Sequence, residues 1–199
     1  MQQNPQQWDE FQWERFLRMR ERRQETIMLY SLRSRNPWRF GQMWSGFQSE
    51  PLPDEEEQED FLYSETDGDE WKITTHPCYR NVSESLEYIR GVLDELPSHK
   101  RLHAAVVELI ARSESIPYLL ATGLTLGEAY NSKGGTIAYC KRALHLTNES
   151  LDYLKELGNE FVVSPEQYAT VIRQCTTARN EIGCFISDIR MGGSISPFA

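Results

Sequence analysis

The sequence predicts an all-α protein, in which an N-terminal helical or irregular arm precedes an antiparallel up-down four-helix bundle. Three observations predict this fold class. In four segments between residues 75 and 192, apolar side chains recur at alternating three- and four-residue spacing, which places them on one helix face. Capping residues, prolines and glycines mark the ends of these segments. The connections between them are short, and short connections favour antiparallel neighbouring helices.

Charge and composition divide the 199-residue chain into four regions. All basic residues of the first region are arginines, residues 50–70 contain no basic residue, and the signs nearly balance after Trp71. The net charge of −9 therefore conceals a basic N-terminal region. We expect the acidic stretch to be a solvated spacer, and the alternative is that it folds back and masks the arginines. The regions are an arm (1–49), an acidic linker (50–74), the bundle (75–192) and a tail (193–199).

Residues 8–32 are predicted to form a ragged amphipathic helix within the arm. One interpretation is that its aromatic residues dock on the bundle or on a neighbouring subunit. The other is that the arm contacts RNA, because guanidinium and aromatic planes both stack on bases. A membrane-surface helix is disfavoured because glutamates interrupt the basic charge. The candidate nucleic-acid-binding residues are Arg15, Arg18, Arg20, Arg22, Arg23, Arg33, Arg35 and Arg39.

A turn-rich segment, NPWRFGQMWSG at residues 36–46, follows the predicted arm helix. Its proline and glycines interrupt regular structure, and its aromatic residues are apolar anchors. We interpret it as a short linear motif that fills an apolar groove. The candidate partner-binding residues of the arm are Trp13, Phe16, Trp38, Phe40 and Trp44.

The first two bundle helices are predicted from residue 75 onward. The first ends at Pro97, and Ser98 caps the second. Pro117 lies inside the second helix or ends it, so a kink or break is predicted near Ser113. Two glycines then allow the chain to turn, at Gly123 and Gly127, before a loop at residues 131–135. The apolar positions are Tyr79, Val82, Leu86, Ile89, Leu93 and Leu96 in the first helix, and Leu102, Ala105, Val106, Leu109 and Ile110 in the second.

The third and fourth helices carry the clearest helical patterns. Gly158 closes the third helix, and the fourth runs from Ser164 to Arg190. Ser164 and Gln167 are placed to form a capping box, with proline between them at the first helical position. The apolar positions are Ile137, Cys140, Leu144, Thr147, Leu151 and Leu154 in the third helix, and Tyr168, Val171, Cys175, Ala178, Ile182, Phe185 and Ile189 in the fourth.

The chain contains few patterns typical of catalysis or metal binding. His99 and His103 have metal-ligand spacing, as do His145 and Glu149, but surface or interface histidines are the preferred interpretation. Ser115 beside the helical proline is interpreted as relieving backbone strain rather than as a nucleophile. No phosphate-binding loop, nucleophile elbow or paired-cysteine site is present. We therefore expect no enzyme activity, metal or cofactor. The unpaired cysteines and the N-terminal sequence favour a reduced, cytoplasmic protein.

The run ARSESIPYLLATG at residues 111–123 resembles the S-I-P-x-N-I-A-E-G signature of four-helix-bundle proteins encoded in intervening sequences of large-subunit ribosomal RNA genes. The same fold family includes the accessory variability determinant of diversity-generating retroelements. Leu119 and Thr122 depart from the signature's Asn and Glu. The matching signature residues are Ser115, Ile116, Pro117, Ala121 and Gly123. Weaker matches between residues 75 and 191 are Tyr79, Leu96, Pro97, Ala143, Leu144, Glu149, Glu156, Leu157, Gly158, Ser164, Glu166 and Tyr168.

This resemblance implies a bundle that assembles as a ring, typically a homopentamer. The retroelement members are non-enzymatic and bind a reverse transcriptase and nucleic acid through a basic surface. Because the bundle here is nearly neutral, the arginines of the arm, which lie outside the family pattern, would have to neutralise the phosphates. We therefore expect an oligomeric accessory protein that scaffolds a partner such as a reverse transcriptase with its RNA. The alternatives are a protein-only interaction scaffold and a metal-binding bundle.

Overall fold

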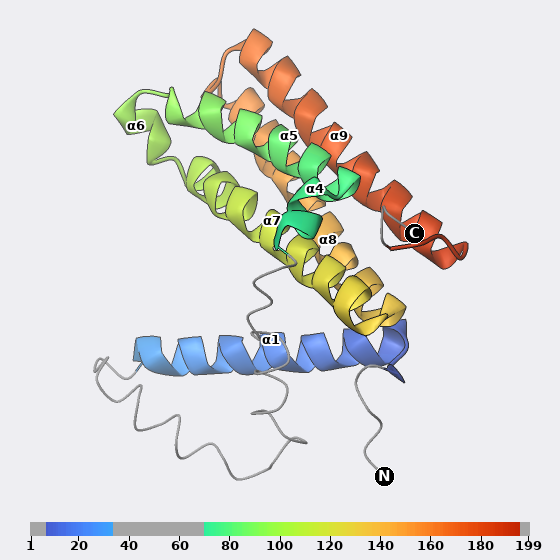
Figure 1. Ribbon diagram of the computed structural model, residues 1–199. Coiled ribbons are helices and arrows are strands. Elements are labelled where there is room, and N and C mark those ends of the chain that lie inside the picture. Colours follow the sequence, from blue (N-terminus) through green and yellow to red (C-terminus); the bar gives the residue numbers. More distant parts are fainter. Residues whose placement is uncertain (1–6, 34–69, 196–199) are drawn as a thin grey trace.

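The computed structural model describes residues 7–33 and 70–195, and Figure 1 shows how their helices are arranged. Every regular element within these residues is a helix, which confirms the all-α prediction. The predicted motif at residues 36–46 lies outside the described residues. The helices are α1 (Glu10–Arg33), α4 (Glu70–Thr75), α5 (Pro77–Asp94), α6 (Ser98–Arg101), α7 (Ala104–Tyr130), α8 (Lys133–Asn159) and α9 (Pro165–Arg190).

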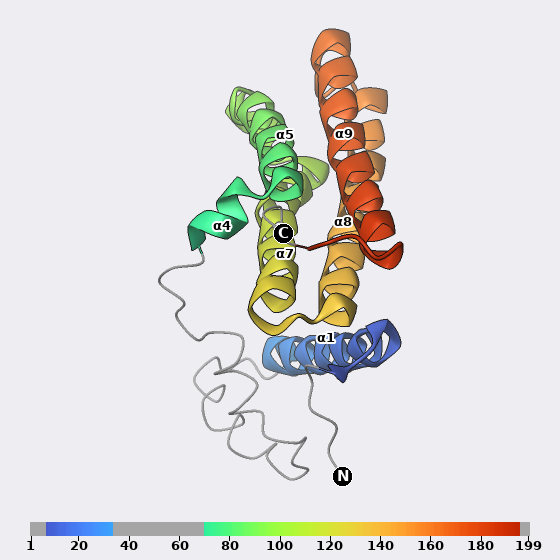
Figure 2. The same cartoon turned by 45° about the vertical axis from the view of Figure 1, so that its right-hand side comes forward.

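Four of the long helices, α5, α7, α8 and α9, lie side by side, and we call them the main helix group (Figures 1 and 2). Helix α7 contacts α8, α8 contacts α9, and α5 contacts both α9 and α7. Helix α1 crosses the end of this group at which α7 connects to α8, and it contacts α8. The N-terminal helix is therefore placed on the same structural unit as the four segments with apolar periodicity.

The interior of the main helix group contains many of the apolar positions that the sequence pattern identified, together with others, such as Leu120, Leu124 and Ile186, that the pattern did not include. The fully or almost fully buried side chains include Val82, Leu93, Val106, Leu154, Val171 and Ile182. Since burying one such side chain contributes about 1.5–3 kcal/mol, this interior is the main source of stability. Cys140 and Cys175 also lie in it as free thiols. Burial raises the pKa of Cys175 to about 12, so its thiol remains protonated and packs as a small apolar group.

The start of helix α9 confirms the predicted capping box. The Ser164 hydroxyl oxygen accepts the Gln167 backbone N–H at 3.2 Å, and the Gln167 Oε1 accepts the Ser164 N–H at 3.0 Å. At the other end of α9, Gly192 has a φ of +93°, a backbone conformation that favours glycine. The predicted limits of the fourth helix therefore agree with the structure.

The second predicted helix is divided in the structure. It was expected to begin at Ser98 and to bury Leu102, but α6 ends at Arg101 and the Leu102 side chain is 81% exposed. The physical reason is the N-cap of α7. The ring nitrogen Nδ1 of His103 accepts the Ala105 backbone N–H at 3.2 Å, so a new helix begins after the histidine.

The prediction of a break near Ser113 and of a turn at the two glycines was wrong. Helix α7 continues through Pro117 and ends at Tyr130. Gly123 and Gly127 provide close helix contacts instead, because a Cβ atom on Gly123 would lie 3.1 Å from the Cβ of Tyr139. The chain reverses at Asn131, which has a φ of 52°, and α8 begins at Lys133 inside the predicted loop.

The C-terminal segment packs against α5, α7 and α9. Ile195 is buried, and a Cβ on Gly127 of α7 would lie 2.5 Å from its Cγ2 atom. The Ile195 carbonyl oxygen lies 3.1 Å from the Nε2 of His76, the residue that precedes α5. The His76 ring packs edge-on against Phe185 of α9. Because a carbonyl oxygen only accepts, the neutral His76 carries its proton on Nε2. Its Nδ1 is buried without a hydrogen-bond partner.

Candidate nucleic-acid interface on helix α1

Helix α1 begins at a reciprocal cap between Asp9 and Gln12. The Asp9 Oδ1 accepts the Gln12 backbone N–H at 2.8 Å, and the Gln12 Oε1 accepts the Asp9 N–H at 2.9 Å. This cap fixes the first turn of the helix and therefore determines which side chains face the main helix group.

The inner face of α1 is anchored by apolar contacts. Trp13 and Leu17, one helical turn apart, are only 3% and 4% exposed. They pack with Leu126 of α7 and with Ala138 and Tyr139 of α8. Trp8 and Phe16 pack edge-on around Trp13, with ring centroids 5.4 and 5.9 Å from it. Trp13 and Phe16 thus contact their own chain, and their binding to another protein stays a prediction.

Gly134 of α8 allows the start of α1 to approach closely. A Cβ atom at this position would lie 2.6 Å from the Trp8 carbonyl oxygen and 2.8 Å from the Glu10 backbone nitrogen. Both are backbone atoms, which cannot rotate away as a side chain can. The two helices can therefore adopt this arrangement only with glycine at position 134.

Three glutamates of α1 form ion pairs with cations of the main helix group. Glu10 pairs with Lys141 at 3.0 Å and with Arg190 at 2.5 Å. Partial burial raises the pKa of the Glu10 carboxyl, but its hydrogen bonds to these two cations outweigh burial, and the pKa lies below its usual value. Glu14 and Glu21 both pair with Arg142, at 3.4 and 2.5 Å. The negative charges of these glutamates are therefore paired within the chain.

The outer face of α1 carries arginines. Arg15, Arg18 and Arg22 are exposed, and the side chain of Arg18 is 71% exposed beside Glu14. Arg20 and Arg23 are partly exposed. Arg33 is the last residue of the helix, and Arg35 and Arg39 lie outside the described residues, as do Trp38, Phe40 and Trp44. The structure thus places six of the eight predicted arginines on one helix, and three of these, Arg15, Arg18 and Arg22, are exposed on it.

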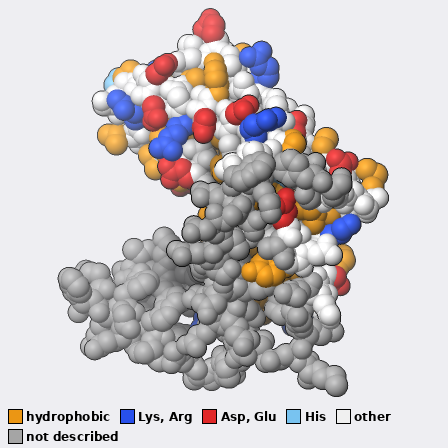
Figure 3. All heavy atoms as spheres, in the orientation of Figure 1, with side chains coloured by type: hydrophobic (Ala, Val, Ile, Leu, Met, Phe, Trp, Pro, Cys, Tyr) orange, Lys and Arg blue, Asp and Glu red, His pale blue; other side chains and the backbone are white. Residues whose placement is uncertain are grey.

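The main helix group offers a different surface. On the face shown in Figure 3, acidic and basic side chains are interspersed over its described helices. Such a mixture does not concentrate positive charge, whereas binding to nucleic acid requires several phosphates to be neutralised together. Compared with that face, the outer face of α1 is the better candidate for contact with a polyanion.

The residues of the proposed family signature occupy structural positions in α7. Ile116 is fully buried, and the Ser115 hydroxyl donates to the Ala111 carbonyl oxygen at 2.9 Å. Gly123 is buried against α8, where the Thr136 hydroxyl donates to its carbonyl oxygen at 2.8 Å. These contacts explain why small or apolar residues are required at these positions. They do not indicate a catalytic or binding role for the signature residues.

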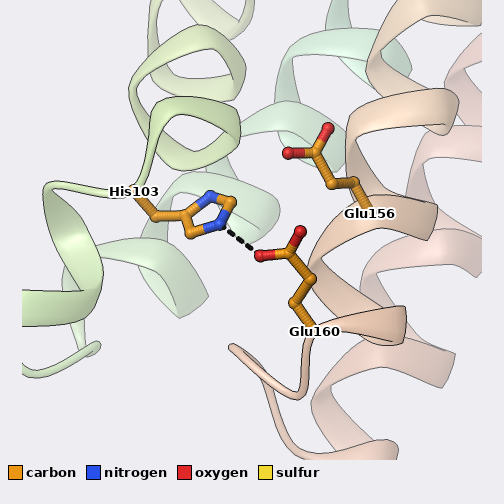
Figure 4. A group of neighbouring side chains, drawn as sticks. All are labelled: His103, Glu156 and Glu160. Carbon is orange, nitrogen blue, oxygen red and sulfur yellow. Dashed lines mark hydrogen bonds and ion pairs between the residues drawn. The ribbon is translucent and has the colours of Figure 1, made fainter.

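One group of potential metal ligands joins the start of α7 to the end of α8 (Figure 4). His103, Glu156 and Glu160 each offer one ligand atom, and these atoms lie within 4.8 Å of one another. The predicted ligand pairs do not assemble in this way. His99 is exposed, and the side chain of His145 is 73% exposed, 3.6 Å from Glu149. Sequence spacing could not identify the new group, because its histidine and its glutamates lie more than fifty residues apart.

The hydrogen bonds of His103 oppose metal binding at this group. Its Nδ1 accepts the Ala105 N–H, so the neutral ring carries its proton on Nε2, which lies 2.8 Å from the Glu160 carboxylate. A metal at Nε2 would require a lone pair there and a proton on Nδ1, and that proton would remove the cap of α7. The group is therefore better described as a hydrogen-bonded link between two helices.

Comparisons with known proteins do not indicate a function, so the proposal depends on the chemistry of the surface. No family model, curated protein or solved structure matches the chain. The resemblance to the ribosomal intervening-sequence proteins therefore stays a prediction. Among the described residues, no helix is both long enough and apolar enough to cross a membrane.

Proposed function

We propose that this protein is a non-enzymatic, oligomeric accessory protein that binds nucleic acid through helix α1 and scaffolds a partner. In this proposal α5, α7, α8 and α9 form an antiparallel up-down four-helix bundle, and the bundle supports assembly into a ring such as a homopentamer. The partner class that fits the sequence resemblance is a reverse transcriptase with its RNA.

The separation of charge on α1 carries this proposal. Glu10, Glu14 and Glu21 pair with Lys141, Arg142 and Arg190, and Glu14 also lies 3.6 Å from Arg18. The cations of α8 and α9 therefore neutralise negative charge that on an isolated helix would be left beside the outward arginines. The buried Trp13 and Leu17 hold the helix in place, so the arginines project from a fixed side of it. A row of guanidinium groups is suited to phosphate contacts, which each group can make with two hydrogen bonds.

A salt titration tests the nucleic-acid part of the proposal. We expect the full-length protein to retain structured RNA on a filter at low salt and to lose it as salt rises. Replacing Arg15, Arg18 and Arg22 by Gln should weaken binding and reduce the slope of log K against log salt by about 2, since each phosphate contact with a single strand contributes roughly 0.7.

The matched control is a second triple variant with the same change in net charge. Arg80, Arg101 and Arg173 are exposed residues of α5, α6 and α9, and replacing them by Gln should leave the slope unchanged. An equal loss in both triple variants would show that net charge, and not α1, governs binding. No binding by the wild-type protein at low salt would contradict the nucleic-acid function itself.

The second candidate is a scaffold that binds only proteins, and the outer face of α7 favours it. Val107 and Tyr118 are 52% and 59% exposed, and residues 115–127 contain no charged side chain. Ala111, Glu114, Ser115, Tyr118 and Leu119 line an open hollow of about 570 Å³ beside this face. Exposed apolar patches of this kind are typical of protein contacts.

A further inference from the structure

The outer face of α1 contains an exposed aromatic ring as well as arginines. Phe11 is 79% exposed, although Trp13 and Phe16 of the same helix pack inward. With about 100° between successive residues, Phe11, Arg15, Arg18 and Arg22 fall within an arc of about 60°. Trp13 lies roughly opposite this arc. The docked helix therefore presents one aromatic ring and three guanidinium groups in a single row.

The dimensions and anchoring of this row suit a single strand. Phe11 and Arg22 are separated by about 16 Å along the helix axis. The cap at Asp9, the close contact at Gly134 and the pair between Glu10 and Arg190 all fix the turn that carries Phe11. The ring is thus held at the surface and belongs to neither of the two buried clusters that the described residues form.

We infer that the outer face of α1 binds single-stranded nucleic acid, with the Phe11 ring stacked on a base and Arg15, Arg18 and Arg22 on the phosphates. This inference rests on the proposed function and specifies the ligand. Stacking on an aromatic side chain requires a base whose face is free, and duplex bases are already stacked on each other. The arginines alone do not distinguish a duplex from a single strand, so Phe11 is the residue that gives this face its preference for a single strand.

A membrane surface fits this face less well. Interfacial helices insert a broad apolar face, whereas over residues 10–23, whose side chains are described, the outer arc contains Phe11 and, at its edge, Met19, which is 44% exposed. In the same part of the helix, Trp13 and Leu17 are already buried against α7 and α8. Three arginines close to one aromatic ring match a polyanion with exposed bases better than a lipid layer.

Fluorescence anisotropy with the full-length protein tests this inference. The probes are a short labelled RNA without self-pairing, its duplex, and single-stranded DNA of the same sequence. We expect Phe11→Ala to weaken binding of the single-stranded RNA by about five- to 150-fold, the range expected for loss of one stacked base. Binding of the duplex should change less than about twofold, because it relies on the arginines.

Two variants serve as controls. Phe161, in the connection between α8 and α9, is also 79% exposed, and Phe161→Ala should leave all affinities unchanged. Phe11→Trp should retain or strengthen single-strand binding, because tryptophan offers a larger stacking surface. Since Phe11 is exposed, circular dichroism should report the same helix content for every variant. If the DNA strand shows the same dependence on Phe11 as the RNA strand, the face recognises unpaired bases in either kind of nucleic acid, and the inference holds.

The outcomes separate this inference from the proposed function. If Phe11→Ala has no effect, or weakens duplex and single strand equally, the inference is overturned while arginine-dependent binding still supports the proposed function. Tighter binding to phosphatidylserine vesicles than to any nucleic acid, lost in Phe11→Ala, would assign the face to membranes and overturn the inference. If the wild-type protein binds no nucleic acid at low salt, both proposals fail.

Discussion

His76 is a buried titratable residue where the start of α5 meets the C-terminal segment. It is 5% exposed and bonded through Nε2 to the Ile195 carbonyl oxygen. Burial lowers the pKa of His76, and the hydrogen bond to Ile195 opposes this effect only in part. A proton added at Nδ1 would find no acceptor. The neutral ring is therefore part of the folded state.

We predict that His76 makes the protein less stable in mild acid. Because its pKa is lower in the folded chain than in the unfolded chain, its contribution is complete above pH 6.5 and is lost as the pH falls below that value. The slope attributable to one histidine is at most about 1.4 kcal/mol per pH unit. Urea unfolding between pH 7 and pH 5 measures it. His76→Gln, which can still donate to Ile195, should flatten the profile, whereas His145→Gln at an exposed site should not.

If the two substitutions flatten the pH profile equally, the buried site is not the cause of the acid sensitivity. Sequence reasoning did not single out His76, since a histidine before Pro77 resembles an ordinary helix start. Its burial depends on Phe185 and Ile195, which are more than one hundred residues away in the chain.

Among the elements, α1 depends on a single glycine for its position. We predict that Gly134→Ala displaces the first turns of α1, because the added Cβ would meet the backbone of Trp8 and Glu10. Amide hydrogen exchange should become faster in residues 10–23, while α5 and α9 remain protected. Gly91→Ala is the matched control, because a Cβ there meets nothing within 4 Å, and alanine should stabilise helix α5 by roughly 0.5–1 kcal/mol. Unchanged exchange in residues 10–23 would contradict this account of α1 docking.

Helix limits were predictable where local chemistry determines them. The Ser164 and Gln167 cap of α9 is readable from sequence because both partners lie within one turn. The path of α7 was not predictable, because Pro117 and Gly123 locally favour a break and a turn. The packing of Gly123 against Tyr139 and the hydrogen bond from Thr136 favour a continuous helix instead. Tertiary contacts here outweigh local propensity.

For the whole molecule, self-assembly is part of the proposed function, and the outer face of α7 is a candidate surface for it. If the outer face of α7 joins subunits, Tyr118→Asp should place a charge in that contact and shift the full-length protein toward monomers in sedimentation velocity. Tyr88→Asp on α5 is the control, since Tyr88 is 47% exposed and should leave the mass unchanged. A wild-type protein that sediments as a monomer at every concentration would contradict the proposed homo-oligomer.

The sequence predicted the residues of the candidate interface better than their arrangement. The arginines of α1 were predicted to bind nucleic acid, and Trp13 and Phe16 to bind a partner, but Phe11 was not identified. The structure places Trp13 on an inner face and Phe11, Arg15, Arg18 and Arg22 on the exposed side. This division depends on partners such as Arg190, whose pairing with Glu10 spans 180 residues and leaves no local pattern.

The position of α1 also has a consequence for synthesis on the ribosome. This helix precedes all the other described helices in the chain, whereas its contacts at Tyr139 and Arg190 belong to the second half of the sequence. At 5–20 residues per second, about 8 to 30 seconds pass between translation of Arg33 and of Arg190. During that interval the Trp13 side of the nascent helix has no completed docking surface, so chaperones would meet this segment before the rest of the protein can cover it.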